Sequence, residues 1–412
     1  MAETVTGPAD DAARIAEYPM PRASGCPFAP PPALEALREE TPVTQVRIWD
    51  GSEPWLITGH AQQRALLADP RVSNDDHFGS FPHVSEYRAQ IAPFTPRMIV
   101  NTDAPEHTRL RRMVTGPFLI KRIEKLREPI QKIVDDLIDD MLAGPNPADL
   151  LTALALPVPS LVISELLGVP YADHEFFQRN SSLALDRAAP PAESQAASRA
   201  MSDYLDKLLG EKLTDPGDDT LSELAGRVNA GELTRSEAVH MGVAMLIAGH
   251  ETTATMISLG TLALLENPEQ LAVLRDTEDP KVVANAVEEL LRYLTIVHSG
   301  LRRVAKEDIE IDGRTIRAGD GILVEITAAN WDREVFPDAD RLDLSRPARH
   351  HNAFGYGPHQ CLGQSLARLE LQVVYSTLYR RVPTLRLAAP IEQLEFDNSG
   401  TTYGVRCLPV TW

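Results

Sequence analysis

The chain has 412 residues, and its 40 basic and 59 acidic side chains give a formal net charge of −19 at pH 7. This acidic excess disfavours nucleic acids and anionic membrane surfaces as partners. The N-terminal segment carries acidic residues early and has no apolar core, and no uncharged apolar run reaches the length of a membrane span. These features predict a cytoplasmic protein without a secretion signal.

In chain order, residues 1–18 are expected to form a disordered tail, and residues 19–412 a single domain. Segments 44–49 and 54–58 flank Asp50-Gly51, which predicts a β-hairpin with a tight turn. Residues 70–100, rich in Pro, Phe and polar side chains, predict a long irregular segment, which in a compact domain is often a functional loop.

Most of the remaining chain has apolar residues at helical spacing. Short strands are expected near 309–324 and 385–410. The overall pattern predicts a mainly α protein with small β-sheets. Helices are expected near residues 60–68, 105–115, 121–142, 158–167, 173–185, 195–212, 234–266, 282–294 and 364–381.

One predicted helix is unusually long. Thr234-Arg-Ser-Glu237 is a capping box, apolar periodicity continues to Leu265, and Asn267-Pro268 ends it, so the helix should be about 45–50 Å long. Its middle, Ala248-Gly-His-Glu-Thr-Thr253, combines a costly glycine with residues that are rarely buried in helices.

The helix face through Ala244, Ala248 and Thr252 changes from small to polar side chains. Small residues leave room for a flat group, and an acid beside a hydroxyl, as in Glu251-Thr252, can pass protons to it. From these residues alone, a core helix with a tolerated polar patch is an equally open interpretation.

The chain contains three cysteines, Cys26, Cys361 and Cys407, which cannot all pair, so no disulfide framework is expected in a reducing cytosol. Cys26 and Cys407 are interpreted as small buried hydrophobic residues. Cys361 differs because it ends the turn-rich segment Phe354-Gly-Tyr-Gly-Pro-His-Gln-Cys-Leu-Gly363 just before a predicted helix. The helix N-terminus favours a thiolate, which suits a nucleophile, with His359 as base, or a single ligand to haem iron.

A third motif, Glu289-Leu-Leu-Arg292, places two opposite charges on one helix face and is a weak signal alone. In this order, the three motifs resemble the cytochrome P450 family over essentially the whole chain from about residue 19. The Cys361 segment fits the family pattern Phe-x-x-Gly-x-His/Arg-x-Cys-x-Gly, residues 248–253 fit Ala/Gly-Gly-x-Glu/Asp-Thr, and residues 289–292 fit Glu-x-x-Arg.

Finer features resemble the actinobacterial members that act on macrolides, steroids, vitamin D and xenobiotics. These features are Cys26-Pro-Phe28, Asp103-Ala-Pro-Glu-His107 and the ending Leu408-Pro-Val-Thr-Trp412. The resemblance implies a triangular-prism fold with haem b between the long helix and the Cys361 helix. It implies monooxygenation of a hydrophobic small molecule such as a polyketide, steroid or xenobiotic, by hydroxylation or epoxidation.

The resemblance also assigns roles to individual residues. Cys361 should be the axial thiolate ligand of the iron, tuned by the amides of Leu362 and Gly363. Thr252 should hydrogen-bond dioxygen and Glu251 should supply protons. The remaining haem-contacting residues would be Ala248, Gly249 and Phe354, together with four propionate-binding residues, His107, Arg111, Arg303 and His359, with Arg302 as the alternative to Arg303.

Other expected roles lie farther from the iron. Glu289, Arg292 and Arg341 are expected to form a structural network behind the haem, and His250 is interpreted as packing or surface rather than ligand. The role of His298 is open between substrate contact and none. Segments 70–100 and 175–200 are expected to gate an apolar substrate pocket, lined by Ala244, Ile247, Ala248, Ile296, Val297 and Thr402.

The resemblance implies a monomer that receives electrons from NAD(P)H through a ferredoxin reductase and a ferredoxin. Since such donors are usually acidic, Arg109 and Arg112 are expected to form a local docking patch, with simple solubilising charges as the alternative. A peroxide-driven relative is disfavoured by the intact Glu251-Thr252 pair, and a non-enzymatic haem-binding or sensing protein is the other alternative. The sequence does not identify the substrate.

Overall fold

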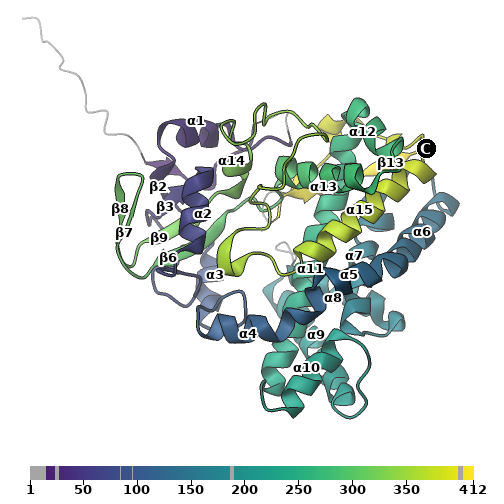
Figure 1. The fold of residues 1–412 in the computed structure, drawn as a ribbon, viewed down its shortest axis with the longest axis horizontal. Coiled ribbons are helices and arrows are strands. Elements are labelled where there is room, and N and C mark those ends of the chain that lie inside the picture. Colours follow the sequence, from purple (N-terminus) through teal and green to yellow (C-terminus); the bar gives the residue numbers. More distant parts are fainter. Residues whose placement is uncertain (1–14, 24–26, 84, 95, 186–189, 398–401) are drawn as a thin grey trace, which may run out of the picture.

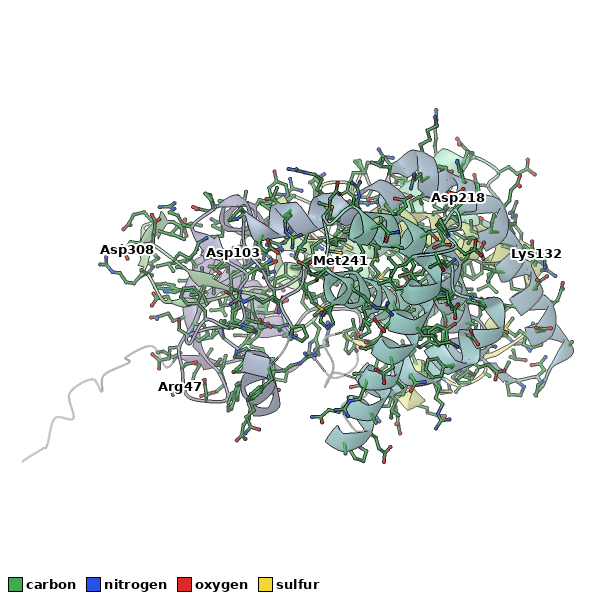
Figure 2. All side chains as sticks on the ribbon, turned by 90° about the horizontal axis from the view of Figure 1, so that it is seen from below. Arg47, Asp103, Lys132, Asp218, Met241 and Asp308 are labelled. Atoms are coloured by element: carbon green, nitrogen blue, oxygen red, sulfur yellow. The ribbon has the colours of Figure 1, made fainter. Side chains whose placement is uncertain are left out.

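The computed structural model describes residues 15–23, 27–83, 85–94, 96–185, 190–397 and 402–412. Figure 1 shows the largest sheet and its covering helices on one side of the molecule and the longer helices on the other. In Figure 2, Asp308 lies at one end and Lys132 at the opposite end, with Met241 between them. Met241 belongs to the long helix, which therefore runs through the middle of the protein.

The largest sheet has six strands in the order β1-β2-β3-β9-β6-β4. The hairpin of β2 and β3 is confirmed, since these strands pair antiparallel with Val43 opposite Ile57. The strands of this sheet are β1 (Ala16–Glu17), β2 (Val43–Arg47), β3 (Trp55–Ile57), β9 (Gly321–Val324), β6 (Leu301–Ala305) and β4 (Val72–Ser73).

The smaller sheets contain β7 (Ile309–Ile311) with β8 (Arg314–Ile316), β11 (Phe396–Asp397) with β12 (Gly404–Val405), and β10 (Arg386–Leu387) with β13 (Pro409–Thr411) and β5 (Ala148–Asp149).

The ordered fold begins earlier than the expected boundary at residue 19. Residues 1–14 of the predicted tail lie outside the described residues, but β1 pairs with β2 in parallel. Tyr18 is buried, and its hydroxyl donates a 2.6 Å hydrogen bond to Glu325. Residues 15–18 therefore belong to the folded protein, because a buried aromatic ring and a strand pairing fix them.

The predicted helices are present, with the segment 121–142 divided by a 3₁₀ turn at Glu124–Leu126. Their bounds are α2 (His60–Ala68), α4 (Glu106–Val114), α5 (Ile120–Ile123), α6 (Arg127–Ala143), α7 (Pro157–Leu167), α8 (His174–Leu185), α9 (Pro191–Lys212), α11 (Arg235–Leu265), α13 (Pro280–Leu294) and α15 (Gln364–Arg381).

Sequence periodicity missed five helices of at most ten residues, and a helix this short offers few turns for a clear pattern. One of these helices, α3, and the strand β4 interrupt the segment 70–100, which was expected to be irregular. The missed helices are α1 (Pro32–Glu40), α3 (Glu86–Ile91), α10 (Thr220–Asn229), α12 (Pro268–Arg275) and α14 (Ile326–Asn330).

Helix α11 has the capping box that its sequence predicts: the Thr234 hydroxyl accepts from the Glu237 amide, and the Glu237 carboxylate accepts from the Thr234 amide. Its 31 residues span about 46 Å. Helices α7, α9 and α15 pack against it. Within the described residues, no helix is both long and apolar enough to cross a membrane.

Helix α11 crosses α15 at Gly260. A Cβ atom built at Gly260 would lie 1.9 Å from Oη of Tyr375, whose hydroxyl donates to the carbonyl of Met256. The absence of a side chain at residue 260 therefore allows the two helices to approach while the buried Tyr375 hydroxyl keeps its hydrogen bond.

Gly260→Ala should lower the free energy of unfolding by about 1–3 kcal/mol, because the added methyl group overpacks this crossing. Gly226→Ala in α10 is a matched control, since nothing lies within 4 Å of the added atom. This control should stabilise the protein by up to about 1 kcal/mol through helix propensity. Urea unfolding of both variants measures the effects, and equal behaviour of the two would contradict the packing argument.

Candidate active site

Cys361 lies in the loop that leads into α15. Its amide donates a 2.9 Å hydrogen bond to the carbonyl of Phe354, which closes the loop. Gly357 has φ +73°, and a Cβ atom there would lie 2.3 Å from the carbonyl oxygen of Leu67, so only glycine fits. The turn chemistry of the motif thus holds the cysteine at the start of the helix.

Two opposing effects act on the pKa of the Cys361 thiol. Burial raises the pKa of the thiol, and the amides of Gly363 and Gln364 and the charges of Arg111 and Arg368 offset this rise only in part. The thiolate expected from the helix start is therefore not favoured by the protein alone. The second amide is thus that of Gln364 rather than the expected Leu362, which packs against the core. The side chain is nevertheless accessible, so the sulfur is surrounded by donors and open on one side, as a metal ligand requires.

Cys407 does not have the buried position expected for it, because its side chain is exposed. It lies between β12 and β13 at the surface. Cys26 lies outside the described residues.

A charged network around Glu288, which the sequence did not predict, supports the cysteine loop. Arg368 of α15 donates to both carboxylate oxygens of Glu288 on α13, at 2.6 and 3.1 Å. Its guanidinium carbon lies 4.5 Å from the centre of the Phe354 ring. Arg368 therefore joins α13, α15 and the loop that carries Cys361.

His351 completes this network. Its Nδ1 atom accepts from the amide of Ala353, so Nε2 carries the proton and faces Glu288 at 3.2 Å. Burial lowers the pKa of His351, so the positive charge of the cluster comes from Arg368. Burial works to raise the pKa of Glu288, but the contacts with His351 and Arg368 lower it to about 2.

The Glu289–Arg292 pair is fully buried, with Arg292 donating to both carboxylate oxygens at 2.7 and 2.8 Å. The third member of this network is Arg346, whose Nε donates to Glu289 at 3.1 Å, whereas Arg341 was expected in this position. The side chain of Arg341 is exposed, and only its carbonyl points inward, 3.4 Å from Arg292. The turn at Asp338–Arg341 directs its carbonyl groups toward the arginines and this side chain toward solvent.

The four predicted propionate-binding residues converge on the cysteine loop. His107 and His359 have ring centres 3.9 Å apart, and Arg111 donates a 2.6 Å hydrogen bond to the carbonyl of Gln360. Arg303 is buried, and burial and the neighbouring Arg302 lower its pKa to about 10. Burial, with repulsion from His107 and Arg303, lowers the pKa of His359 to about 3.

Among the described residues, these four lack neighbouring carboxylates as partners. In the described part of the chain, no carboxylate forms an ion pair with His107, Arg111, Arg303 or His359, and the buried Nε2 of His107 has no hydrogen-bond partner. The nearest acid, Asp103, is held by Ser73, Asn74 and Lys306. Two arginines without a carboxylate partner and a buried histidine nitrogen without any partner fit a group that brings its own carboxylates, as the propionates of haem do.

The choice between Arg302 and Arg303 follows from their neighbours. Arg303 faces His359, whose pKa it lowers, whereas Arg302 donates a 3.4 Å hydrogen bond to the Ser299 hydroxyl and lies near Tyr18. Adjacent residues of a strand point to opposite faces. Arg303 is therefore the one that belongs to the cationic cluster.

In the middle of α11, the side chains of Thr252 and Glu251 both have hydrogen-bond partners within the protein. The Thr252 hydroxyl donates a 2.8 Å hydrogen bond to the carbonyl of Ala248, and the Glu251 carboxylate accepts one of 2.8 Å from Thr402. Ala248 is exposed although most of the helix is buried, and Ala244 and Ile247 on the same face are partly accessible. This face of the helix is thus open where the sequence predicted a flat group.

Gly249, which follows Ala248, is partly accessible, and its missing side chain is explained by its packing. A Cβ atom at this position would be 3.2 Å from Cδ1 of Ile163, so its small size serves the packing of α11 on α7. Its neighbour His250 is a buried core residue that hydrogen-bonds Ser181 at 2.8 Å, and burial lowers its pKa to about 4. The haem contact expected for Gly249 stays a prediction, because packing against Ile163 does not involve the rest of its backbone.

The residues expected around the substrate come from separate segments that lie side by side. Val297 forms a β-bridge with Thr402, and the carbonyl of Ile296 accepts from the amide of Tyr403. His298 lies near Tyr403, with ring centres 6.1 Å apart. Thr402 also forms a polar contact, because its hydroxyl donates a hydrogen bond to Glu251.

The two arginines expected to dock a redox partner have different surroundings. Arg109 bonds Glu106 and the carbonyl of Glu232, and it forms a short ion pair with Glu237. Its side chain therefore fixes α4 to the start of α11 and is not free for docking. Arg112 is exposed and has no ion pair within the described residues.

Sequence reasoning thus missed Arg346, Gln364 and the Glu288–Arg368–His351 network. The available signal was Glu288 itself, a second acid on a largely apolar helix, because such a residue is rarely buried without a partner.

Comparisons with known proteins agree with this geometry. The family model described as Cytochrome P450 matches residues 45–382. Cytochrome P450 CYP105Q4 from Mycobacterium marinum is 54% identical over 414 residues, covering 100% of both chains. The crystal structure of GfsF has a TM-score of 0.93 and 55% identity, and covers 96% of this chain and 100% of its own.

A further similar structure is mycinamicin VIII C21 methyl hydroxylase from Micromonospora griseorubida bound to mycinamicin VIII. It has a TM-score of 0.89 and 43% identity, and covers 97% of this chain and 100% of its own. These likenesses confirm the mainly helical fold with small sheets that the sequence predicts.

Glu288→Gln should destabilise the protein by about 3 kcal/mol at pH 7, because the ionised carboxylate is bound more tightly in the folded state. The folded pKa of about 2 lies below the unfolded value. The contribution is therefore complete above about pH 4.5 and is lost as the pH falls toward 2. Urea unfolding at pH 7, 4 and 3 measures this difference.

The exposed Glu269→Gln on α12 is the control for charge removal and should be nearly neutral. A loss at Glu288 that stayed constant down to pH 3 would show that ionisation of this carboxyl is not its source.

Proposed function

The chain belongs to the cytochrome P450 family and is a monooxygenase of that family, and we propose that Cys361 holds its haem iron and that its substrate is a hydrophobic small molecule. The accessible Cys361 sulfur, with two amide donors at the start of α15, carries this proposal. The other described cysteine, Cys407, lacks such surroundings, because burial and then the neighbouring acid Asp149 raise its pKa and no amide or arginine offsets this rise.

The cationic cluster supports the placement of the cofactor. His107, Arg111, Arg303 and His359 would bind the propionates, and Phe354 would pack beside the thiolate loop. When bound, haem supplies the binding and reductive activation of dioxygen. The tasks left to the chain are to hold the thiolate, neutralise the propionates, exclude water and deliver protons.

Glu251 and Thr252 are the proposed proton-delivering pair. Their backbone positions are adjacent on α11, and the Thr252 hydroxyl sits one turn from Ala248 on the accessible face. A hydroxyl that bonds a backbone carbonyl can exchange that partner for a closer acceptor at low cost, since one hydrogen bond replaces another. Glu251 can then replace the proton that Thr252 passes on.

The proposed substrate is a polyketide, a steroid or a xenobiotic. Ala244, Ile247, Ile296 and Val297 supply mainly apolar surface near the accessible face of α11, which suits a hydrophobic ligand. The relative named for C21 methyl hydroxylation of mycinamicin VIII supports the same class. Segments 70–100 and 175–200 would gate the pocket. Titration of a compound library, followed by the haem Soret shift, would identify the ligand.

The protein purified with haem b should give a ferrous–CO adduct with the red-shifted Soret band of thiolate ligation. Cys361→His should move this band to the imidazole position, because the axial donor changes. Cys407→Ser, at the exposed cysteine, is the control and should leave the band unchanged. Retention of the thiolate band by the Cys361 variant would show that another residue holds the iron.

Arg112 is the proposed docking residue for an acidic ferredoxin, which would receive its electrons from NAD(P)H through a reductase. Arg112→Glu should slow reduction by ferredoxin about tenfold, and added salt should slow the unmodified protein, because exposed charges are screened within about 10 Å at 0.1 M. Stopped-flow reduction measures both effects.

Peroxide-driven turnover bypasses the donor and should be unchanged in Arg112→Glu. Arg109→Glu is the contrasting variant: it breaks the contacts with Glu106 and Glu237 and should lower stability instead. Equal loss in the ferredoxin and peroxide assays of Arg112→Glu would contradict a docking role.

A further inference from the structure

The Glu251 carboxylate is bound by a residue 151 positions away in the chain. Oγ1 of Thr402 donates a 2.8 Å hydrogen bond to Oε1 of Glu251. Thr402 is buried and Glu251 is partly buried. Within the described residues, no arginine, lysine or histidine forms an ion pair with Glu251, so the Thr402 hydroxyl is the group that fixes the orientation of this acid.

The segment around Thr402 is itself fixed by several contacts. The β-bridge with Val297 and the 2.8 Å hydrogen bond from the Tyr403 amide to the Ile296 carbonyl hold its backbone. The Tyr403 ring stacks on Phe396 at 5.6 Å, and the Arg22 guanidinium lies 3.8 Å from the ring centre. The Thr402 hydroxyl is therefore presented to α11 from a braced position.

The same segment packs closely on α11 one turn after the acid. A Cβ atom at Gly404 would lie 3.0 Å from Cγ2 of Thr255, so β12 approaches the helix as closely as a glycine allows. Glu251 and Thr255 share a helix face because they are four residues apart, and Thr402 and Gly404 share a strand face because they are two apart. The two contacts thus belong to one interface.

We propose that Thr402 is a positioning residue for Glu251 that ties the acid to the wall of the substrate pocket. Its hydroxyl holds one carboxylate oxygen, and its backbone is paired with Val297, a residue of that wall. A ligand that displaces the wall formed by Ile296 and Val297 moves the Thr402 hydroxyl and so changes where Glu251 points. Proton supply is thereby coupled to occupancy of the pocket, an inference that rests on the proposed function of Glu251.

The test compares Thr402→Val, which keeps the side-chain shape but removes the donor, with Thr402→Ser, which restores it. In Thr402→Val, product formed per NADPH should fall about 3- to 10-fold, the effect expected for one hydrogen bond. Hydrogen peroxide release and the solvent deuterium isotope effect should both increase. Substrate affinity from the Soret titration should change less than about twofold, and Thr402→Ser should recover the coupling.

A readout independent of turnover is the crystal structure of Thr402→Val, in which the Glu251 carboxylate should leave its present position. Thr315→Val is the matched control, because the Thr315 hydroxyl also donates to a glutamate, Glu310 Oε1 at 2.7 Å, on the β7–β8 hairpin. This control should change neither coupling nor the isotope effect. If Thr402→Val does not fold, Thr402→Ala removes the hydroxyl without adding bulk.

Glu251→Gln separates this inference from the function on which it rests. If Glu251→Gln leaves product yield per NADPH unchanged, the proposed proton role of Glu251 fails. If Glu251→Gln lowers that yield while Thr402→Val does not, only the positioning role of Thr402 is overturned. Weaker substrate binding with unchanged coupling in Thr402→Val would likewise overturn it, since Thr402 would then be only a pocket residue.

Discussion

Two adjacent buried carboxylates on α13 set a constraint that much of the structure satisfies. A buried charge is tolerated only with a full set of partners, and removal of one partner is costly. Glu289 takes its partners from Arg292 and Arg346, whereas Glu288 takes them from Arg368 and His351. Because consecutive residues of a helix point in different directions, α13 is anchored on one side to the 338–346 segment and on the other to α15 and the cysteine loop.

This anchoring gives the cysteine loop a defined position before any cofactor chemistry is considered. The Arg368 guanidinium packs on Phe354, whose carbonyl accepts a hydrogen bond from the Cys361 amide, and its charge offsets part of the rise in the thiol pKa that burial causes. On the other side of the loop, His359 and Gln360 meet α4 through His107 and Arg111. A protein with a net charge of −19 thus brings Arg111, Arg303 and Arg368 together near one loop, where the carboxylates of the proposed cofactor would be neutralised.

The middle of α11 is held by close helix packing and by hydrogen bonds from its polar residues to neighbouring elements. Gly249 and Gly260 let α7 and α15 approach the helix, while Ala248 stays accessible. The residues that break the apolar pattern have defined partners: His250 bonds α8 and Glu251 bonds Thr402. The polar turn is therefore built into the packing of the surrounding elements, and the acid–alcohol pair is held by the same segments that would contact a substrate.

The sequence by itself determined the long capped helix, the β2–β3 hairpin and the cysteine turn, because each depends on residues within a few positions of one another. The motifs also identified the family. Only the tertiary structure decided that Arg346 replaces Arg341, that Arg109 is bound by acids, that Gly249 faces α7 and that Thr402 reaches Glu251. A residue's type and its helix face can be inferred locally, but its partner depends on which distant segment the fold brings alongside it, and a single sequence carries no direct record of that pairing.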